Sequence, residues 1–327
     1  MRKILFLMAI NLALSPFARA ATPLEPGKTQ SVGVWQAPAG LQQIPIWPNA
    51  APDMDGAPKT PESILTAQTP EALEGGISKA VFDVSVPTMT IFPPKGQNTG
   101  AAIVVFPGGG FKILAITIEG TEICNWIASK GITCILSKYR VPKGNHYWDS
   151  ELKRAVTPKV LRALQDAQRT IRLVRSKAKA LNLDPSKIGV MGFSAGGYLV
   201  AQTSNIFEPA YKTVDSIDRI SSRPDFAIAF FPGHLCRDGD RLDPGIKVTK
   251  RTPPTFLLQA WDDPVDPICN STLYVRALNT AQVPAEVHLF ATGGHAFGLR
   301  RKHSPDTVWP GLLETWLRGI GVLKPAY

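Results

Sequence analysis

The sequence predicts an α/β fold in which a mostly parallel central sheet carries helices on both faces. Apolar runs of strand length alternate with longer amphipathic segments from about residue 81 onward. Several of these runs are continuously apolar, which is typical of parallel strands buried on both faces. The 327 residues, 44% of them hydrophobic, are enough to build one large core.

The predicted elements follow from the local periodicity. Residues 81–92 alternate apolar and polar side chains, whereas residues 101–106 form a continuous apolar run, and both patterns predict strands. Residues 159–182 have helical spacing and end before Asp184-Pro185, where a helix is expected to stop. The other predicted strands are 132–139, 188–191, 226–231, 255–260 and 285–290, and the other predicted helices are 118–130, 195–204, 271–281 and 307–320.

The first 20 residues have the three parts of a secretory signal. Arg2 and Lys3 precede an apolar run at 4–14, and residues 18–20 supply the small side chains of a cleavage site. The apolar run is about half the roughly 20 residues that span a bilayer. We therefore expect residues 1–20 to be a signal peptide and the mature protein to be secreted or periplasmic, without a membrane partner.

Residues 21–80 are rich in Pro, Gly, Thr and Ala and keep neither a helical nor a strand period. The segment lacks the apolar residues for a core of its own. We expect an extended N-terminal arm that wraps a single domain formed by residues 81–327.

The formal charge of +10 is dispersed along the chain. The basic residues between Arg169 and Lys179 are spaced like the solvated face of a helix, and they lack the interleaved aromatic residues of a nucleic-acid site. We therefore expect no nucleic acid as a partner. The sequence leaves the oligomeric state open.

Four cysteines are present. Cys236 and Cys269 follow strands that end at one edge of the predicted sheet, so they could form a disulfide in an oxidising compartment. Cys124 and Cys134 lie among apolar residues, and we expect them to be free and buried. The chain has no C-x-x-C or Cys/His metal spacing, so we assign no metal and no cofactor.

The strongest local motif is Gly-Phe-Ser-Ala-Gly at 192–196, placed between a predicted strand and a predicted helix. A serine hydroxyl becomes an effective nucleophile when a sharp strand-to-helix turn lifts it out of the backbone, and that turn needs small flanking residues. Ser194 is therefore the candidate nucleophile. An ordinary glycine-rich turn is the alternative.

A second motif, Pro107 followed by three glycines, ends the apolar strand at 101–106. Glycines leave backbone N–H groups exposed to a developing oxyanion. We expect Gly109 and Gly110, together with Ala195, to form an oxyanion hole. A structural turn remains possible, whereas a phosphate loop lacks its Gly-Lys-Ser/Thr ending.

The general base and its acid are expected after the serine, at the ends of later strands and with the acid first. His295 lies in a glycine-rich loop after the last predicted strand, and we expect it to be the base. Asp262, Asp263 and Asp266 compete for the acid within one loop. Asp266, next to a proline, is expected to cap the following helix or to shape the turn.

Several stretches carry a resemblance to a known family. They include VVFPGGGF at 104–111, IGVMGFSAGGYL at 188–199, TPPTFLLQAWDDPVDP at 252–267 and EVHLFATGGHAFGLR at 286–300. Together they resemble the α/β-hydrolase superfamily and, within it, secreted carbohydrate esterases similar to bifunctional acetyl-xylan and feruloyl esterases. Two positions depart from the wider family: Pro107 stands where many esterases carry histidine, and Ala296 stands where glycine is expected.

The resemblance implies an α/β-hydrolase fold and a serine esterase that deacylates, foremost deacetylates, plant-wall carbohydrate. In similar hydrolases the acid commonly precedes a valine by three positions. Val265 follows Asp262 at that distance, so the resemblance favours Asp262, with Asp263 as the alternative. The implied partner is an acylated carbohydrate.

The segment 141–162 is a candidate wall of the substrate cleft. His146, Tyr147 and Trp148 lie in it, and sugars favour aromatic platforms. A plain surface connection is the alternative.

Two other functional classes remain open. A prolyl-oligopeptidase-type peptidase shares the serine turn, but an arm of about 60 residues is too short for the domain that filters its peptides. A non-catalytic carbohydrate-binding protein would be expected to lose one of the Ser, His and Asp groups. Glycosidase chemistry needs two opposed carboxylates, and the sequence contains no recognisable pair.

Overall fold

The computed structural model describes residues 28–54, 58–68, 76–142, 147–149, 154–156, 161–300 and 304–325. The expected signal peptide at residues 1–20 lies outside these ranges. Within them, no helix combines the length and the apolar character needed to cross a bilayer.

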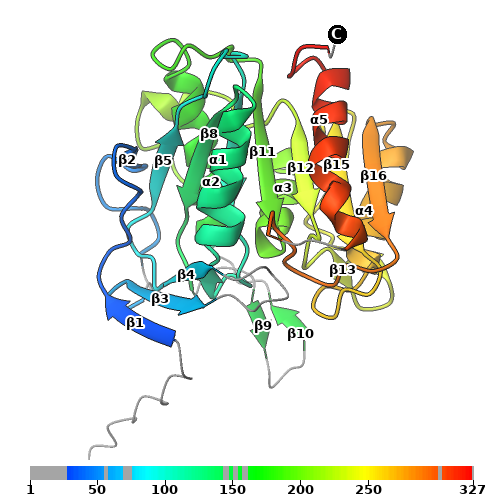
Figure 1. The fold of residues 1–327 in the computed structure, drawn as a ribbon, viewed down its shortest axis with the longest axis horizontal. Helices are drawn as coiled ribbons and strands as arrows, with labels where there is room; N and C mark the ends of the chain where they lie inside the picture. Colours follow the sequence, from blue (N-terminus) through cyan, green and yellow to red (C-terminus); the bar gives the residue numbers. More distant parts are fainter. Residues whose placement is uncertain are drawn as a thin grey trace, which may run out of the picture.

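An eight-stranded sheet forms the centre of the molecule, in the order β16-β15-β12-β11-β6-β8-β5-β2 (Figure 1). Its strands from β16 to β8 are parallel, whereas β5 runs antiparallel to β8, and β2 runs antiparallel to β5. The sheet confirms the predicted α/β class. The strands are β2 (Gln42–Pro45), β5 (Thr88–Phe92), β6 (Ala102–Phe106), β8 (Thr133–Lys138), β11 (Ile188–Phe193), β12 (Ala227–Phe230), β15 (Thr255–Ala260) and β16 (Ala285–Phe290).

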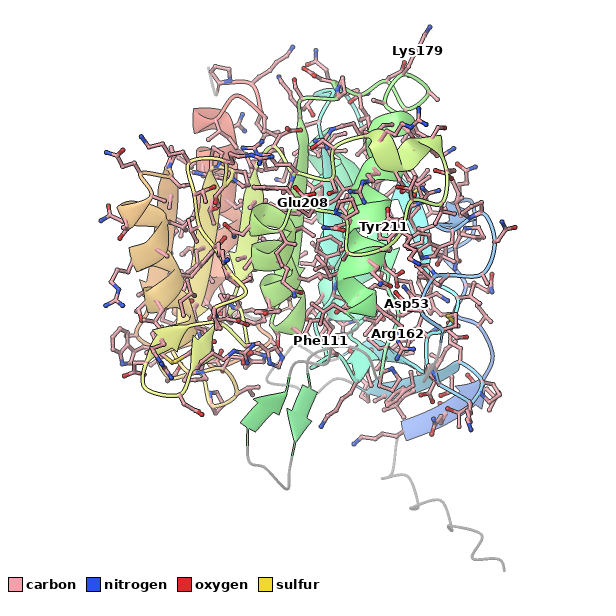
Figure 2. All side chains as sticks on the ribbon, turned by 180° about the vertical axis from the view of Figure 1, so that it is seen from behind. Asp53, Phe111, Arg162, Lys179, Glu208 and Tyr211 are labelled. Carbon is pink, nitrogen blue, oxygen red and sulfur yellow. A yellow bond between two sulfur atoms is a disulfide. The ribbon has the colours of Figure 1, made fainter. Side chains whose placement is uncertain are left out.

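Helices cover both faces of this sheet. In Figure 1, α1 and α5 lie in front of the strands, and Figure 2 shows the other helices on the opposite face. The main chain of each inner strand pairs with a neighbour on both sides, so the helices need only cover the side chains of the sheet. The helices are α1 (Glu122–Ser129), α2 (Arg162–Ser176), α3 (Ala195–Asn205), α4 (Cys269–Thr280) and α5 (Trp309–Gly319).

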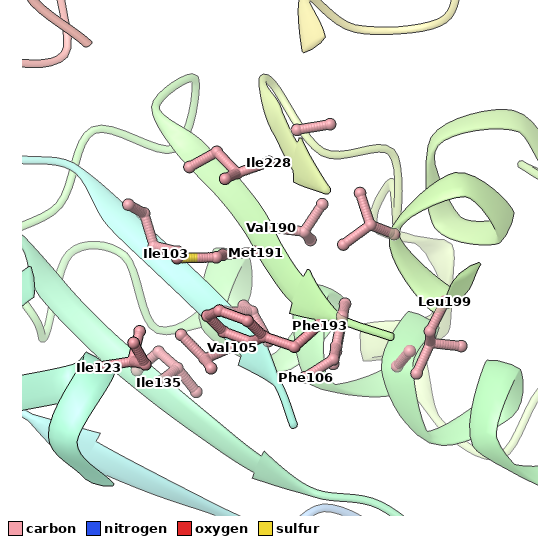
Figure 3. Close-up of a cluster of buried hydrophobic side chains, with 14 of the residues drawn as sticks. Ile103, Val105, Phe106, Ile123, Ile135, Val190, Met191, Phe193, Leu199 and Ile228 are labelled. Carbon is pink, nitrogen blue, oxygen red and sulfur yellow. The ribbon is translucent and has the colours of Figure 1, made fainter. Parts of the chain in front are cut away.

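The core surrounds the central strands of the sheet, and every residue of β6 and β11 is buried. Figure 3 shows Ile103 and Val105 of β6 beside Met191 of β11, with Ile123 of α1 and Leu199 of α3 in the same cluster. Each such side chain contributes about 1.5–3 kcal/mol by leaving water. Burial on both faces explains why these strands are continuously apolar rather than alternating.

Several predicted boundaries differ from the structure. The single strand expected at 81–92 is two strands, β4 (Ile77–Phe82) and β5, separated by a turn that includes Asp83 with φ of 54° and Pro87. Proline has no amide hydrogen for a strand ladder, which favours a break there. The helix expected at 118–130 begins as a π-helical segment, η2 (Thr117–Thr121), before α1.

The segment expected to be an extended arm contains strands that its composition did not predict. It contributes β2 to the edge of the central sheet, and a separate antiparallel sheet forms in the order β1-β3-β4-β7. These strands depend on distant partners, since β2 pairs with β5 and β4 pairs with β7. Besides β4, the strands of this second sheet are β1 (Lys28–Val32), β3 (Ser63–Gln68) and β7 (Ile113–Leu114).

All four cysteines form disulfides. The bridge between Cys236 and Cys269 that the sequence allowed is present. The expectation that Cys124 and Cys134 are free is wrong, because α1 packs against β8 and brings their Cα atoms to 5.2 Å, which is within disulfide range. Their apolar surroundings indicated burial but not pairing.

Candidate active site

The parallel strands all deliver their following loops to one edge of the sheet, where ligand sites of this architecture form. Ser194 lies there, in the turn between β11 and α3. Its backbone has φ of 53° and ψ of −117°, a conformation that a residue other than glycine adopts only under strain. The turn therefore holds the serine hydroxyl away from the surrounding main chain.

The glycines around Ser194 are required by close backbone contacts. A Cβ atom on Gly192 would lie 2.1 Å from the carbonyl oxygen of Gly196, and one on Gly196 would lie 2.0 Å from that of Phe106. Either methyl group would overlap a rigid backbone atom. The small residues of the predicted motif thus allow β11 and α3 to meet at a sharp angle.

The glycine loop after β6 lies beside this turn. Gly109 has φ of 128° and Gly110 has φ of 61°, both in the region that favours glycine. In the part of the chain that the structure describes, their amides donate to no protein acceptor, and both residues line the same cavity as Ser194. Ala195 is the first residue of α3, so its amide has no partner within the helix. The three predicted oxyanion donors therefore lie around one site.

His295 is held by Asp263. The Nδ1 atom of His295 lies 2.8 Å from Oδ2 of Asp263. The other carboxylate oxygen of Asp263 accepts the amides of Val265 at 2.9 Å and Asp266 at 3.0 Å. These contacts turn the buried carboxylate inward, toward the imidazole.

Asp262, which the resemblance favoured, does not contact His295. Its exposed side chain accepts the amide of Gly294 at 2.7 Å. The candidate acid is therefore corrected from Asp262 to Asp263. The two side chains point in different directions after β15, and the Asx turn at Asp263 directs its carboxylate toward the imidazole. The three-position spacing between Asp262 and Val265 did not reveal which of the two carboxylates points toward the imidazole.

Asp266 occupies a position that the sequence did not predict. Ser194 donates its hydroxyl hydrogen to Oδ2 of Asp266 at 3.1 Å, and the same oxygen lies 3.8 Å from Nε2 of His295. Its carboxylate packs against Gly233, where a Cβ atom would lie 2.7 Å from Oδ1. Asp266 does not cap α4, which was one of its two expected roles, because its carboxylate contacts the candidate nucleophile. The other expected role, shaping the turn, agrees with its backbone hydrogen bonds to Asp263 and Gln259.

The electrostatics of the site follow from burial and from these contacts. Burial by itself lowers the pKa of His295, but the hydrogen bond to Asp263 and the nearby carboxylates outweigh it and raise the pKa above the ordinary value. Burial would raise the pKa of Asp263, yet its bonds to His295 and to backbone amides hold that pKa below the usual range. Burial raises the pKa of Asp266 to about 6.

A further buried carboxylate supports the glycine loop. Glu119, on η2, is 2% exposed and accepts the amide of Gly108 at 2.8 Å. Burial raises the pKa of Glu119 to about 7. Tyr139 donates its hydroxyl hydrogen to the carbonyl oxygen of Pro107 at 2.5 Å. Sequence reasoning missed Glu119, although an acidic residue within the apolar helical pattern at 118–130 was a visible signal.

A cavity of about 1350 Å³ opens over Ser194 and His295. One continuous segment, residues 236–245, forms much of its wall and contains the short strands β13 (Cys236–Arg237) and β14 (Arg241–Leu242). The segment follows β12 at the carboxyl edge of the sheet, where ligand sites form. Its place in the sequence was therefore a signal that it lines the site.

The wall predicted from residues 141–162 is only partly described. His146 lies outside the described residues, and Tyr147 and Trp148 belong to β9 (Tyr147–Asp149), which pairs with β10 (Arg154–Val156). Figure 1 shows this hairpin projecting beyond the sheet edge at which β11 and β16 end. Substrate binding by these three residues stays a prediction.

Among the described residues, Cys236, Asp240 and Cys269 have atoms close enough to surround a metal ion. Both sulfurs are joined in a disulfide, however, and a disulfide sulfur is not the thiolate that binds metals. The cluster therefore does not fit a metal ion.

Comparison with known proteins places the chain in a family. A protein-family model named BD-FAE matches residues 89–218. An acetylxylan esterase from Xylanibacter ruminicola is 28% identical over 261 residues, which cover 72% of this chain and 49% of that protein. The crystal structure of an acetyl ester-xyloside bifunctional hydrolase from Caldicellulosiruptor lactoaceticus is 30% identical, with a TM-score of 0.67 over 86% of this chain and 97% of that one. The chain belongs to the α/β-hydrolase esterases.

A further similar structure is esterase 2 from Thermogutta terrifontis, phosphorylated by paraoxon. It shares 25% identity and a TM-score of 0.60 over 74% of this esterase and 92% of that chain. The esterase is thus a serine hydrolase of carboxylic esters. It spans about half the length of the acetylxylan esterase that it matches.

Proposed function

We propose that this esterase removes acyl groups, foremost acetyl, from plant-wall carbohydrate through a triad of Ser194, His295 and Asp263. The observation that carries the proposal is the meeting of Ser194, the His295–Asp263 pair and the amides of Gly109 and Gly110 at one cavity. These are the groups that acyl transfer requires.

The proposed reaction begins when His295 accepts the hydroxyl hydrogen of Ser194 at Nε2. The serine oxygen bonds to the ester carbonyl carbon, and the carbonyl oxygen becomes an oxyanion. His295 then donates the proton to the leaving sugar oxygen as the ester bond breaks. Water deacylates the enzyme by the same steps in reverse order, releasing the free acid.

The amides of Gly109, Gly110 and Ala195 would stabilise the oxyanion. Each such donor is worth roughly two to three decades in rate when it is already oriented before the reaction. Glu119 supports their orientation, because it holds the neighbouring amide of Gly108 through a buried hydrogen bond. Asp263 would keep the imidazole in the tautomer that has a free Nε2.

The carbohydrate substrate is supported by two relatives, an acetylxylan esterase and an acetyl ester-xyloside hydrolase. The cavity wall is also rich in polar side chains, including Arg237, Asp238, Asp240 and Arg241. Such groups can exchange hydrogen bonds with sugar hydroxyls.

Secretion is a separate part of the proposal. The N-terminal 20 residues have the pattern of a signal peptide, and the two disulfides suit an oxidising compartment. Expression of the full chain, followed by N-terminal sequencing of the protein recovered outside the cytoplasm, should give a mature start at Ala21. A protein that keeps Met1 in the cytoplasm would contradict secretion.

The first prediction tests the nucleophile. We expect Ser194→Ala to lower kcat for 4-nitrophenyl acetate by on the order of a million-fold, because the members of a triad act as one unit. Circular dichroism should show an unchanged fold. A folded Ser194→Ala protein that keeps its activity would overturn the proposed function.

The substrate class is tested by the products. Acetylated xylan should release acetate faster than feruloylated xylan releases ferulate, and a proline-peptide anilide should not be cleaved. Faster ferulate release would reverse the proposed acyl preference. Cleavage of the anilide would favour a peptidase, and no turnover of any substrate would favour a binding protein.

A further inference from the structure

The loop after β15 places two carboxylates around one imidazole. Asp263 lies on the Nδ1 side of His295, at 2.8 Å. Asp266 lies on the Nε2 side, at 3.8 Å, and its Oδ2 atom also accepts the hydroxyl of Ser194. Asp266 therefore touches the atom that would attack the substrate, a contact that the Ser-His-Asp scheme does not require.

The position of Asp266 is firmly held. Its amide donates to Asp263 at 3.0 Å, and its carbonyl oxygen accepts the side-chain amide of Gln259 at 2.6 Å. Gln259 in turn accepts the hydroxyl of buried Ser271. These bonds fix both sides of the Asp266 backbone, and the absence of a side chain at Gly233 leaves room for the carboxylate.

We propose that Asp266 is a second catalytic carboxylate, which orients the hydroxyl of Ser194 before reaction and balances the charge of His295 during it. The inference rests on the proposed triad. It assigns Asp266 a role separate from that of Asp263, because the two carboxylates face different nitrogens of the imidazole.

The proposed sequence of events conserves every proton. In the resting state the hydroxyl hydrogen of Ser194 points to Asp266. When the serine oxygen bonds to the carbonyl carbon, that hydrogen passes to Nε2 of His295, and Asp266 remains a carboxylate. The new Nε2–H then faces Oδ2 of Asp266 until the proton moves to the leaving oxygen. An imidazolium with a carboxylate near each nitrogen is stabilised by both charges.

The groups around His295 set the direction of the pH effect. Asp263 and Asp266 face the imidazole from the loop after β15, and the charge of Glu119 on η2 raises its pKa. The ring centroid of Phe231, which follows β12, lies 4.7 Å from that of the imidazole. The three carboxylates favour protonated His295, which cannot act as a base. Removing the charge of Asp266 should therefore lower the pKa of His295 and extend activity to lower pH.

The experiment measures kcat and KM for 4-nitrophenyl acetate from pH 4 to pH 9 in wild type, Asp266→Asn and Asp266→Ala. We expect the acidic limb of kcat/KM to move to lower pH in both variants. At the alkaline plateau kcat should fall on the order of tenfold, with a smaller change in KM, because the stabilised charge belongs to the transition state. The alanine variant also removes any amide that could bond to His295.

Asp262→Asn is the matched control. It removes a carboxylate from the same loop, while the asparagine oxygen can still accept the amide of Gly294, and Asp262 does not contact Ser194 or His295. Its acidic limb should stay at the wild-type pH. Unmoved limbs in both folded Asp266 variants, or equal shifts in Asp262→Asn, would overturn the role of Asp266.

The outcome is separable from that of the proposed function. Activity in a folded Ser194→Ala protein would contradict the proposed triad itself. An inactive Ser194→Ala together with a wild-type pH profile in Asp266→Asn and Asp266→Ala would leave the triad standing and remove only the second carboxylate.

Discussion

Asp262 and Asp263 are adjacent in the chain but have different surroundings. Asp263 is buried, accepts two backbone amides and bonds to His295. Asp262 is exposed and accepts only the amide of Gly294 among the described residues. A carboxylate orients an imidazole through direct contact, so the one that has this contact is the proposed acid.

This difference predicts opposite results for two conservative variants. Asp263→Asn should lower kcat by roughly three to four decades, because the amide no longer selects the productive tautomer of His295. Asp262→Asn should change kcat by less than about tenfold, because its amide oxygen can still accept from Gly294. Steady-state kinetics with 4-nitrophenyl acetate measure both. The reverse order of losses would restore Asp262 as the acid.

At the scale of elements, the cavity wall at 236–245 is tied to the start of α4. Cys236 bonds covalently to Cys269, and the amide of Cys236 donates to Asn270 at 2.7 Å. Within the wall, Asp243 accepts the hydroxyl of Tyr198 at 2.6 Å. The loop after β12 and the helix after the acid loop therefore hold each other in place beside the site.

Removal of the Cys236–Cys269 bridge should affect binding as well as stability. The bridge closes a loop with a sequence separation of 33 residues. Its loss in Cys236→Ser/Cys269→Ser should lower the free energy of unfolding by roughly 3–4 kcal/mol through chain entropy. KM for acetylated xylan should rise as the wall loosens. Urea unfolding and initial-rate kinetics measure the two effects.

The second bridge is a matched control for that experiment. Cys124 and Cys134 are separated by 10 residues and join α1 to β8, and neither lines the cavity. Cys124→Ser/Cys134→Ser should lose on the order of 3 kcal/mol of stability but keep the wild-type KM. Equal KM changes in the two double variants would contradict the role of the wall. Thiol counting on the unfolded, unreduced wild type should find no free cysteine.

At the scale of the whole molecule, the N-terminal segment is joined to the central sheet by a buried ion pair. Lys138, the last residue of β8, donates to both carboxylate oxygens of Glu62 at 2.7 and 2.8 Å, and Glu62 also accepts the amide of Trp35. Burial lowers the pKa of Lys138, while Glu62 partly opposes that shift. An unpaired ammonium at this depth would be costly.

The ion pair predicts that the segment is needed for a stable fold. Glu62→Ala should lower the free energy of unfolding by about 3–5 kcal/mol, because it leaves the ammonium of Lys138 buried without its partner. The partly exposed pair of Lys130 and Glu314 serves as a comparison, and Glu314→Ala should cost less than about 1 kcal/mol. Urea unfolding measures both. Equal losses would mean that the segment adds little to the core.

The sequence by itself determined the α/β class, the turn at Ser194, the glycine loop and the loop that carries His295. Each shows a local pattern: continuous apolar runs predict buried strands, and glycines are needed where a Cβ atom would lie about 2 Å from a backbone atom. The apolar runs and the contact between Gly192 and Gly196 involve residues close together in the sequence, so these patterns can be read along the chain.

Only the tertiary structure decided which carboxylate meets His295, which residue contacts Ser194 and which cysteines pair. Asp263 and Asp266 are defined by the path of a turn, and the bridge between Cys124 and Cys134 depends on the packing of α1 against β8. The strands of the N-terminal segment likewise need partners far away in the sequence. Directions and distances of this kind arise when separate elements pack together, and one-dimensional periodicity does not contain them.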